Sequence, residues 1–295
     1  AMTGGDIYLK CENRQKTGSF KIRGASNKIA ALMERGGLQA VVASSAGNHA
    51  QGVACAARKF GIPATIVMPK AAPIAKVQAT ENYGARVVLA GDCYGGAALQ
   101  ITGLVGGGSA YFITHGLVHR DAFAGQGTLG LEILGDLPSV DIVIAPAGGG
   151  GLLAGVAAAI KQINPRVKVY GVQAAGAPSM VNSIRDGKIE RLDNVSTIAD
   201  GIKVKEPGQH TFDICSKYVD EIVTVTDDEI STAILTLIEQ QKLITEGAGA
   251  VSVAAVLFDK IPVEGKNVVC LLSGGNIDVT ILSRVISRGL LKSGR

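Results

Sequence analysis

Short runs rich in valine, isoleucine and alanine recur along the chain between longer stretches with helix-like character. Such nearly continuous apolar runs are typical of strands that are buried on both faces of a parallel sheet. We therefore predict strands at 6–10, 40–44, 64–68, 86–89, 141–145, 167–171 and 267–271. Because these strands alternate with helical stretches, the pattern predicts an α/β fold.

A chain of 295 residues has room for two lobes, each with its own core. We expect twisted, mostly parallel sheets flanked by helices in both. We place a small domain at 39–115 and a large domain at 1–38 and 116–295. Segment 101–120 is rich in glycine and weakly periodic, and we interpret it as a strand and loop that return the chain to the larger lobe.

Composition narrows the class of protein. Apolar residues make up 47% and the 39 glycines are spread along the chain, which indicates a globular protein rather than a low-complexity one. The net charge of +4 comes without a long basic run, so we expect no nucleic-acid partner. We also expect no membrane association, because the sequence has no apolar stretch of about 20 residues.

The cysteines are five in number and widely spaced, and they show neither CxxC nor metal-ligand spacing: Cys11, Cys55, Cys93, Cys215 and Cys270. This usage is typical of reduced, buried thiols, and it predicts a cytoplasmic protein.

Candidate site loops follow three of the predicted strands, at 44–48, 148–151 and 273–276. In open α/β sheets, ligands bind beyond the carboxyl ends of the strands. We therefore expect these loops to converge on one crevice.

The segment after the strand at 141–145 contains four consecutive glycines and then begins a helix. Glycines let the backbone approach an anion, and the N–H groups at the helix start favour a phosphate. Gly149, Gly151 and Ala154 also satisfy the GxGxxA dinucleotide fingerprint. That alternative is weaker because Gln173, and not an acidic residue, follows the next strand. We favour a single phosphate monoester.

Three polar segments accompany the glycines. Lys21 stands at a helix start beside Phe20, where shielding from water would ease loss of its proton, as a Schiff-base amine requires. Residues 44–52 offer hydroxyls, an amide and helix-start N–H groups that suit a carboxylate. Ser273, after the last predicted strand, could reach a ring nitrogen. Each segment alone is weak, and together they point to one cofactor.

Five segments resemble, in content and order, the threonine/serine dehydratase and serine racemase family, and especially its catabolic threonine dehydratases. They are TGSFKIRGA, SAGNHAQG, GGGGL, IADGI and LSGGNID. The resemblance covers nearly the whole chain. It implies a pyridoxal-phosphate enzyme of fold type II, similar in architecture to the tryptophan synthase β subunit, and an assembly of two or four identical subunits.

The resemblance also implies roles for particular residues. Lys21 would carry pyridoxal 5'-phosphate as a Schiff base, with Phe20 beside it. Asn48 would bind the phenolic oxygen, Ser273 the pyridine nitrogen, and Gly201 would pack near the ring. The implied phosphate cradle consists of Gly148, Gly149, Gly150, Gly151 and Leu152, and the implied substrate contacts are Ser45, Ala46, Gly47, Asn48 and His49.

The implied reaction is α,β-elimination from a β-hydroxy amino acid, L-threonine or L-serine first, giving a 2-oxo acid and ammonia. Lys21 would take the Cα proton, and the cofactor would delocalise the electrons left behind. Alternatives are a dehydratase for another substrate such as 3-hydroxyaspartate, an amino-acid racemase, or a catalytically silent protein that binds the cofactor.

The chain departs from the family pattern at four places. Ala46 stands where related racemases carry a second-face serine, so we expect little racemisation. Gln173 and Ser179 stand where acidic side chains would hold a divalent cation, so we expect no tight magnesium site and leave a monovalent ion held by carbonyl oxygens as the alternative. Residues 115–120 differ from the family's substrate loop, which leaves the side-chain preference open. We also expect no C-terminal amino-acid-sensing domain, because the chain ends at Arg295.

Overall fold

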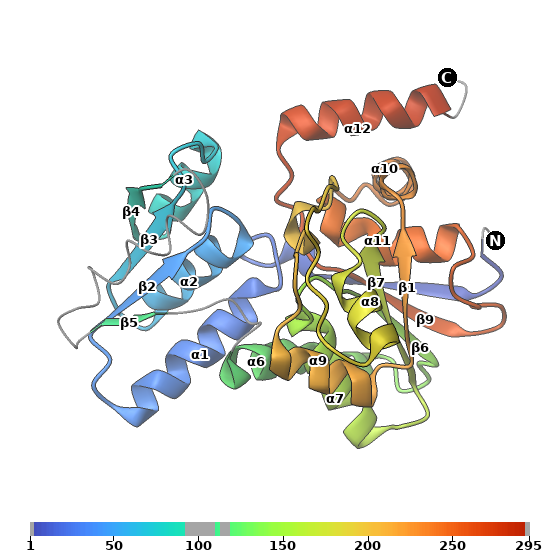
Figure 1. Ribbon diagram of the computed structural model, residues 1–295, viewed down its shortest axis with the longest axis horizontal. Helices are drawn as coiled ribbons and strands as arrows, with labels where there is room; N and C mark the ends of the chain where they lie inside the picture. The colour runs from blue at the N-terminus through green and yellow to red at the C-terminus, as the bar shows by residue number, and fades with distance from the viewer. Residues whose placement is uncertain (1–2, 92–109, 113–118, 293–295) are drawn as a thin grey trace. The chain divides into compact units, whose positions relative to one another are not determined.

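The computed structural model describes residues 3–91, 110–112 and 119–292, in two compact units (Figure 1). The large unit consists of residues 1–14 and 126–295, and the small unit of residues 15–125. This division groups residues 15–38, with Lys21, in the small unit, whereas the sequence predicted their place in the large domain. The predicted domain boundaries stay a prediction.

The large unit contains a five-stranded sheet in the order β1-β9-β6-β7-β8, and all of its strand pairs are parallel. Its strands are β1 (Asp6–Cys11), β6 (Ile142–Pro146), β7 (Lys168–Ala174), β8 (Glu221–Val225) and β9 (Asn267–Leu272). Its helices are α7 (Gly151–Ile163), α8 (Ser179–Asp186), α9 (Gln209–Tyr218), α10 (Asp227–Thr236), α11 (Gly247–Leu257) and α12 (Val279–Lys292). It also has two short 3-10 helices, η1 (Glu12–Arg14) and η2 (Asp200–Ile202), and a π-helix, η3 (Leu237–Gln241).

The small unit contains a four-stranded sheet in the order β4-β3-β2-β5, again with parallel pairs only. Its strands are β2 (Ala40–Ser44), β3 (Ala64–Met68), β4 (Arg86–Leu89) and β5 (Ala110–Phe112). Its helices are α1 (Lys21–Arg35), α2 (Asn48–Lys59) and α3 (Ile74–Asn82), and α6 (Arg120–Asp136) begins in this unit and ends in the large one.

The predicted fold class is confirmed, because both sheets are parallel and alternate with helices. The predicted strands at 40–44, 64–68 and 86–89 have the observed bounds, and the other predicted strands differ by one to three residues at their ends. The sequence did not predict β8. This edge strand is only partly buried, so its residues lack the dense apolar run that marks the central strands.

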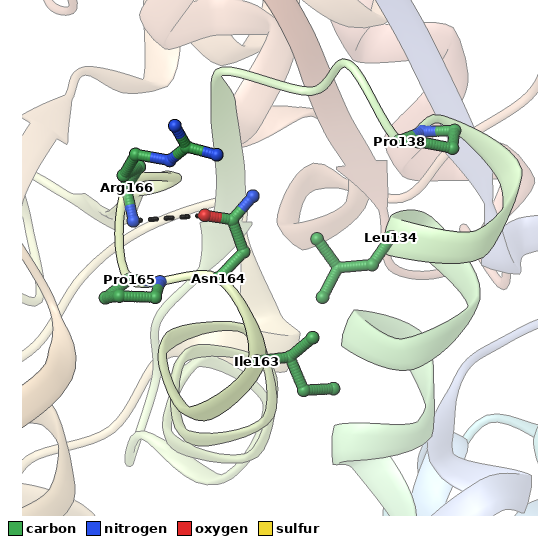
Figure 2. Close-up of a pocket in the computed structure, with 6 residues that line it drawn as sticks. All are labelled: Leu134, Pro138, Ile163, Asn164, Pro165 and Arg166. Atoms are coloured by element: carbon green, nitrogen blue, oxygen red, sulfur yellow. Dashed lines mark hydrogen bonds between the residues drawn. The ribbon is translucent and has the colours of Figure 1, made fainter.

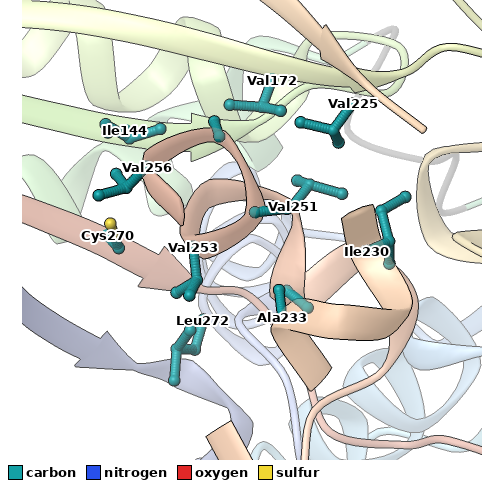
Figure 3. Packing of buried hydrophobic residues seen from close by; sticks show 14 of the residues in the cluster. Ile144, Val172, Val225, Ile230, Ala233, Val251, Val253, Val256, Cys270 and Leu272 are labelled. Atoms are coloured by element: carbon teal, nitrogen blue, oxygen red, sulfur yellow. The ribbon is translucent and has the colours of Figure 1, made fainter. Parts of the chain in front are cut away.

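In the core of the large unit, α11 packs against the sheet and α10 packs against α11 (Figure 3). Val251 and Val256 of α11 lie among side chains of β6, β7 and β9, such as Ile144 and Cys270. Small residues let α11 approach closely. A Cβ atom on Gly249 would lie 2.3 Å from the carbonyl oxygen of Gly274, so this packing requires glycine and fixes the turn after β9.

Within the described residues, every helix is too short or too polar to cross a lipid bilayer.

Candidate active site

The glycine loop, residues 148–151, connects the carboxyl end of β6 to the start of α7. Gly150 is the N-cap of α7 and has φ +95°, a conformation that favours glycine. A Cβ atom on Gly148 would lie 3.0 Å from Cα of Ile202. Both positions therefore require glycine for structural reasons.

The carbonyl oxygens of this loop are held by side chains. Gln173 Nε2 donates to the carbonyl oxygen of Gly148 at 3.4 Å, and Thr211 Oγ1 donates to that of Gly149 at 2.5 Å. No residue that the structure describes accepts a hydrogen bond from the N–H groups of Gly149, Gly150 or Gly151. Unpaired N–H groups at a helix start form an anion site. The loop fits a phosphate group.

Gly201 and Ser273 both contact the first turn of α11 in the large unit. Ser273 Oγ donates to the carbonyl oxygen of Ala248 at 3.2 Å, and its side chain is buried. Gly201 is exposed, and a Cβ atom on it would lie 3.0 Å from Cβ of Ala248 and 3.3 Å from Oε1 of Glu246. The structure thus brings together two predicted residues, and beside them a buried carboxylate that the sequence did not predict.

Lys21 is the first residue of α1 in the small unit. Its Nζ lies 5.1 Å from the ring centroid of Phe20, which is itself the N-cap of the helix and buried. A Cβ atom on Gly52 of α2 would lie 3.0 Å from the carbonyl carbon of Lys21. This close approach of α2 fixes the backbone from which the Lys21 side chain extends.

The serine loop, residues 44–48, connects β2 to α2 in the same unit. Ser45 Oγ accepts a hydrogen bond from the N–H of Gly47 at 3.2 Å, and Ala46 is buried. Gly47 is the N-cap of α2 and offers no side chain to the first N–H groups of the helix. The helix start can therefore receive a carboxylate, with the Ser45 and Asn48 side chains beside it.

An ion cluster that the sequence did not predict joins α1 to the start of α6 within the small unit. Lys28 is buried, and its Nζ bonds to His119 Nε2 and lies 3.4 Å from Asp121 Oδ2. Arg35 also pairs with Asp121, at 3.0 Å. Burial lowers the pKa of His119, and the Lys28 ammonium lowers it further. Burial likewise lowers the pKa of Lys28.

Gln173 and Ser179, the two positions where acidic metal ligands were predicted to be absent, are both buried in the large unit, and the side chain of Gln173 is hydrogen-bonded. Gln173 is fully buried, and its Oε1 accepts from the N–H of Val181 at 2.9 Å. Ser179 is fully buried at the start of α8. Among the residues that the structure describes, no cluster of three histidine, cysteine or acidic side chains is arranged to hold a metal ion.

The thiols of four cysteines, Cys11, Cys55, Cys215 and Cys270, are free of disulfides. Burial raises the pKa of Cys215 and of Cys270 to about 12, so neither is a thiolate at neutral pH. Cys93 and residues 115–118 of the predicted substrate loop lie outside the described residues.

A surface hollow of the large unit is lined by residues that precede β6 and β7, near the amino-terminal ends of these strands (Figure 2). Leu134, Pro138 and Ile163 line it, together with residues 164–166. Because ligands of open α/β sheets bind beyond the carboxyl ends of strands, we do not assign the active site to this hollow.

Comparisons with known proteins identify the family of this chain. Residues 1–274 match the family described as pyridoxal-phosphate dependent enzymes. The chain is 57% identical to an L-threonine ammonia-lyase of Thermotoga maritima, over 100% of this chain and 73% of that protein. The chain belongs to the pyridoxal-phosphate-dependent enzyme family, and pyridoxal phosphate is its cofactor.

Two solved structures are similar over nearly the whole chain. The processed form of threonine deaminase isoform 2 from Solanum lycopersicum has a TM-score of 0.91 at 39% identity, covering 98% of this chain and 80% of that one. Maize serine racemase has a TM-score of 0.90 at 35% identity, covering 100% of this chain and 90% of that one. The predicted fold-type II architecture is confirmed by these similarities.

Proposed function

We propose that the protein is an ammonia-lyase that converts L-threonine, and more slowly L-serine, to the 2-oxo acid and ammonia. The observation that carries this proposal is the 57% identity, over the full chain, to an L-threonine ammonia-lyase. In the overall reaction the proton on Cα and the hydroxyl on Cβ leave as one water molecule. One water molecule is then taken up when the C–N bond is hydrolysed. L-threonine therefore yields 2-oxobutanoate and ammonia.

The residues proposed to hold the cofactor divide between backbone and side-chain donors. The N–H groups of Gly149, Gly150, Gly151 and Leu152 would bind the phosphate, together with the loop backbone at Gly148. When bound, the cofactor supplies a conjugated ring that delocalises the electrons left at Cα. Asn48 Nδ2 would donate to the phenolic oxygen.

Lys21 Nζ would have two tasks in the small unit. It would hold the cofactor covalently and, as a free amine, would take the proton from Cα. Its contact with the Phe20 ring restrains the side chain, and the close packing of Gly52 restrains the backbone. Lys21 therefore moves a proton on one face of Cα.

The serine loop would position the substrate. Its helix-start N–H groups and the Ser45 hydroxyl would bind the carboxylate. Ala46 and Gly47, in the turn before α2, and His49, in its first turn, would also contact the substrate. Ser273 Oγ would donate its single proton to the ring nitrogen in place of the Ala248 carbonyl, as a neutral group. Unlike a carboxylate, a hydroxyl does not stabilise a proton on that nitrogen, which moderates the carbanion and suits elimination.

Racemisation is the second candidate, since maize serine racemase covers the whole chain at 35% identity. Ala46 disfavours it. This position is buried and carries a methyl group, so it offers no proton to the second face of Cα. Elimination should therefore predominate.

We further propose a homodimer or homotetramer in the cytoplasm. The four cysteines that the structure describes are free thiols, which supports a reducing compartment. Sedimentation of the holoenzyme would determine the number of subunits.

The experiment that tests the function is a panel of β-hydroxy amino acids assayed for 2-oxo acid and ammonia. We expect L-threonine to give the highest kcat/KM, with L-serine second and 3-hydroxyaspartate lower. Cofactor binding without product from any member of the panel would instead indicate a silent cofactor-binding protein.

A further inference from the structure

The back of the glycine loop, on the side to which its carbonyl oxygens point, is built from three fully buried side chains of the large unit. They are Gln173 of β7, Met180 of α8 and Thr211 of α9. Thr211 Oγ1 is 2.5 Å from the carbonyl oxygen of Gly149 and 2.9 Å from that of Gly208. A threonine hydroxyl has a single proton, and the shorter distance assigns it mainly to Gly149.

Holding these carbonyls also sets the direction of the neighbouring N–H groups. The described peptide bonds are all trans, and across a trans peptide the carbonyl of one residue and the N–H of the next point in opposite directions. When Gln173 holds the Gly148 carbonyl, the N–H of Gly149 points away from Gln173. When Thr211 holds the Gly149 carbonyl, the N–H of Gly150 points away from Thr211.

Packing from the same side leaves the loop little freedom to turn. A Cβ atom on Gly150 would lie 2.5 Å from Met180 Cε and 2.9 Å from Thr211 Cβ. The N–H of Gly208, the N-cap of α9, also reaches the Gly149 carbonyl, at 3.4 Å. Together with the Gln173 contact from β7, these contacts from α8 and α9 come from three separate elements, so the loop cannot rotate toward any one of them.

We propose that Thr211 and Gln173 are positioning residues that aim the N–H groups of Gly149 and Gly150 at the cofactor phosphate. This inference rests on the proposed function, in which the glycine loop binds that phosphate. Gln173 acts from the end of β7, because its amide bonds to the Gly148 carbonyl on one side and to the N–H of Val181 on the other. Thr211 acts from the first turn of α9.

The test compares the affinity of the apoprotein for pyridoxal phosphate with its affinity for pyridoxal, which lacks the phosphate group. Thr211→Val keeps the side-chain shape and removes the hydroxyl. A net hydrogen bond is worth about 0.5–1.5 kcal/mol, so we expect the Kd for pyridoxal phosphate to rise roughly 2- to 13-fold. The Kd for pyridoxal should change less than about twofold, because that ligand does not use the loop.

Two variants serve as controls. Thr211→Ser retains the hydroxyl and should keep the ratio of the two Kd values within about twofold of the wild type. Gln173→Met has a similar shape and removes the second brace, so it should lower the preference for pyridoxal phosphate in the same way. If Thr211→Val does not fold, the two Kd values of Gln173→Met test the proposal instead. Melting of each apoprotein checks that the fold is retained.

Equal weakening for both ligands would overturn the proposal, because it would mean that Thr211 and Gln173 support the fold in general. Unchanged affinity for pyridoxal phosphate in folded Thr211→Val and Gln173→Met would overturn it as well. A wild-type protein that does not prefer pyridoxal phosphate over pyridoxal would have a different meaning. It would overturn the phosphate assignment in the proposed function, and this inference with it.

Discussion

The glycine loop of the large unit and the serine loop of the small unit both follow a parallel strand and begin a helix, yet they are held differently. In the glycine loop, buried side chains hold the carbonyls, and no described residue accepts a hydrogen bond from the N–H groups of Gly149 to Gly151. In the serine loop, the Ser45 side chain belongs to the loop itself and accepts from the N–H of Gly47.

This difference separates two kinds of recognition. A phosphate is the same in every pyridoxal-phosphate enzyme, and rigid backbone N–H groups are sufficient to bind it. A substrate differs from enzyme to enzyme, and side chains such as Ser45 and Ala46 can be exchanged without altering the backbone. Changes in the glycine loop should therefore affect cofactor affinity, whereas changes in the serine loop should affect substrate kinetics.

The largest expected effect is that of Gly150→Asp, which tests whether the backbone of the glycine loop binds the phosphate. The new side chain would meet Met180 and Thr211 within 2.9 Å, at φ +95°, and would place a negative charge beside the phosphate. We expect a loss of more than about 100-fold in affinity for pyridoxal phosphate, from strain and charge repulsion together. Cofactor titration of the apoprotein measures it.

Gly187→Asp is the matched control, because Gly187 has φ +66° but a Cβ atom there would meet nothing within 4 Å. It carries the same backbone strain and the same charge away from the loop. Its cofactor affinity should stay near the wild-type value. Wild-type affinity in Gly150→Asp would remove the glycine loop from the phosphate site.

Ser45→Ala tests whether a side chain of the serine loop binds the substrate. Loss of one hydroxyl that binds a carboxylate costs about 1.5–3 kcal/mol, so we expect KM for L-threonine to rise roughly 10- to 100-fold. The Kd for pyridoxal phosphate should be nearly unchanged. The neighbouring variant Ser44→Ala is the control, since the buried Ser44 hydroxyl has no hydrogen-bond partner among the described residues. A change in cofactor affinity equal to the change in KM would contradict the separation.

Ala46→Ser sharpens the comparison within the serine loop. A hydroxyl at this buried position would offer a proton to the second face of Cα, so racemisation should increase relative to elimination. Chiral chromatography of the remaining L-serine, beside an assay of the 2-oxo acid, gives the ratio. Substantial racemisation by the wild type would refute the one-base argument, and an unchanged ratio in the variant would show that a hydroxyl here is insufficient.

The smallest expected effect concerns stability and the ion cluster of His119. Its folded pKa lies below the usual 6.5, so below that pH the unfolded chain binds a proton that the folded protein does not. The free energy of unfolding should therefore fall as the pH falls below 6.5 toward the folded pKa. The imidazole is 39% exposed, and screening should keep the change well under about 1 kcal/mol.

Urea unfolding at pH 7.5 and pH 5.5, for the wild type and for His119→Gln, measures this effect. The variant cannot titrate at this position, so the wild type should lose more stability than the variant on acidification. An equal loss in both proteins would show that His119 does not couple to folding.

Much of the fold follows from local sequence because central strands must be apolar on both faces. The strand at 64–68 was predicted with its observed bounds, while the partly buried edge strand β8 was not predicted. Gly148 and Gly150 could be predicted as a loop because four consecutive glycines mark it. The pairing of Thr211 with Gly149 could not, since the two lie 62 residues apart and only the folded α9 brings them together.

The central claim is that Lys21 carries the cofactor of an eliminating enzyme, and reduction by borohydride tests it most directly. Reduction fixes the cofactor to the amino group that holds it, and peptide mapping then locates the modified lysine. We predict a yellow holoenzyme whose label is confined to the peptide containing Lys21, and loss of threonine elimination on labelling. A label on another lysine, or no bound cofactor after reconstitution, would contradict the account.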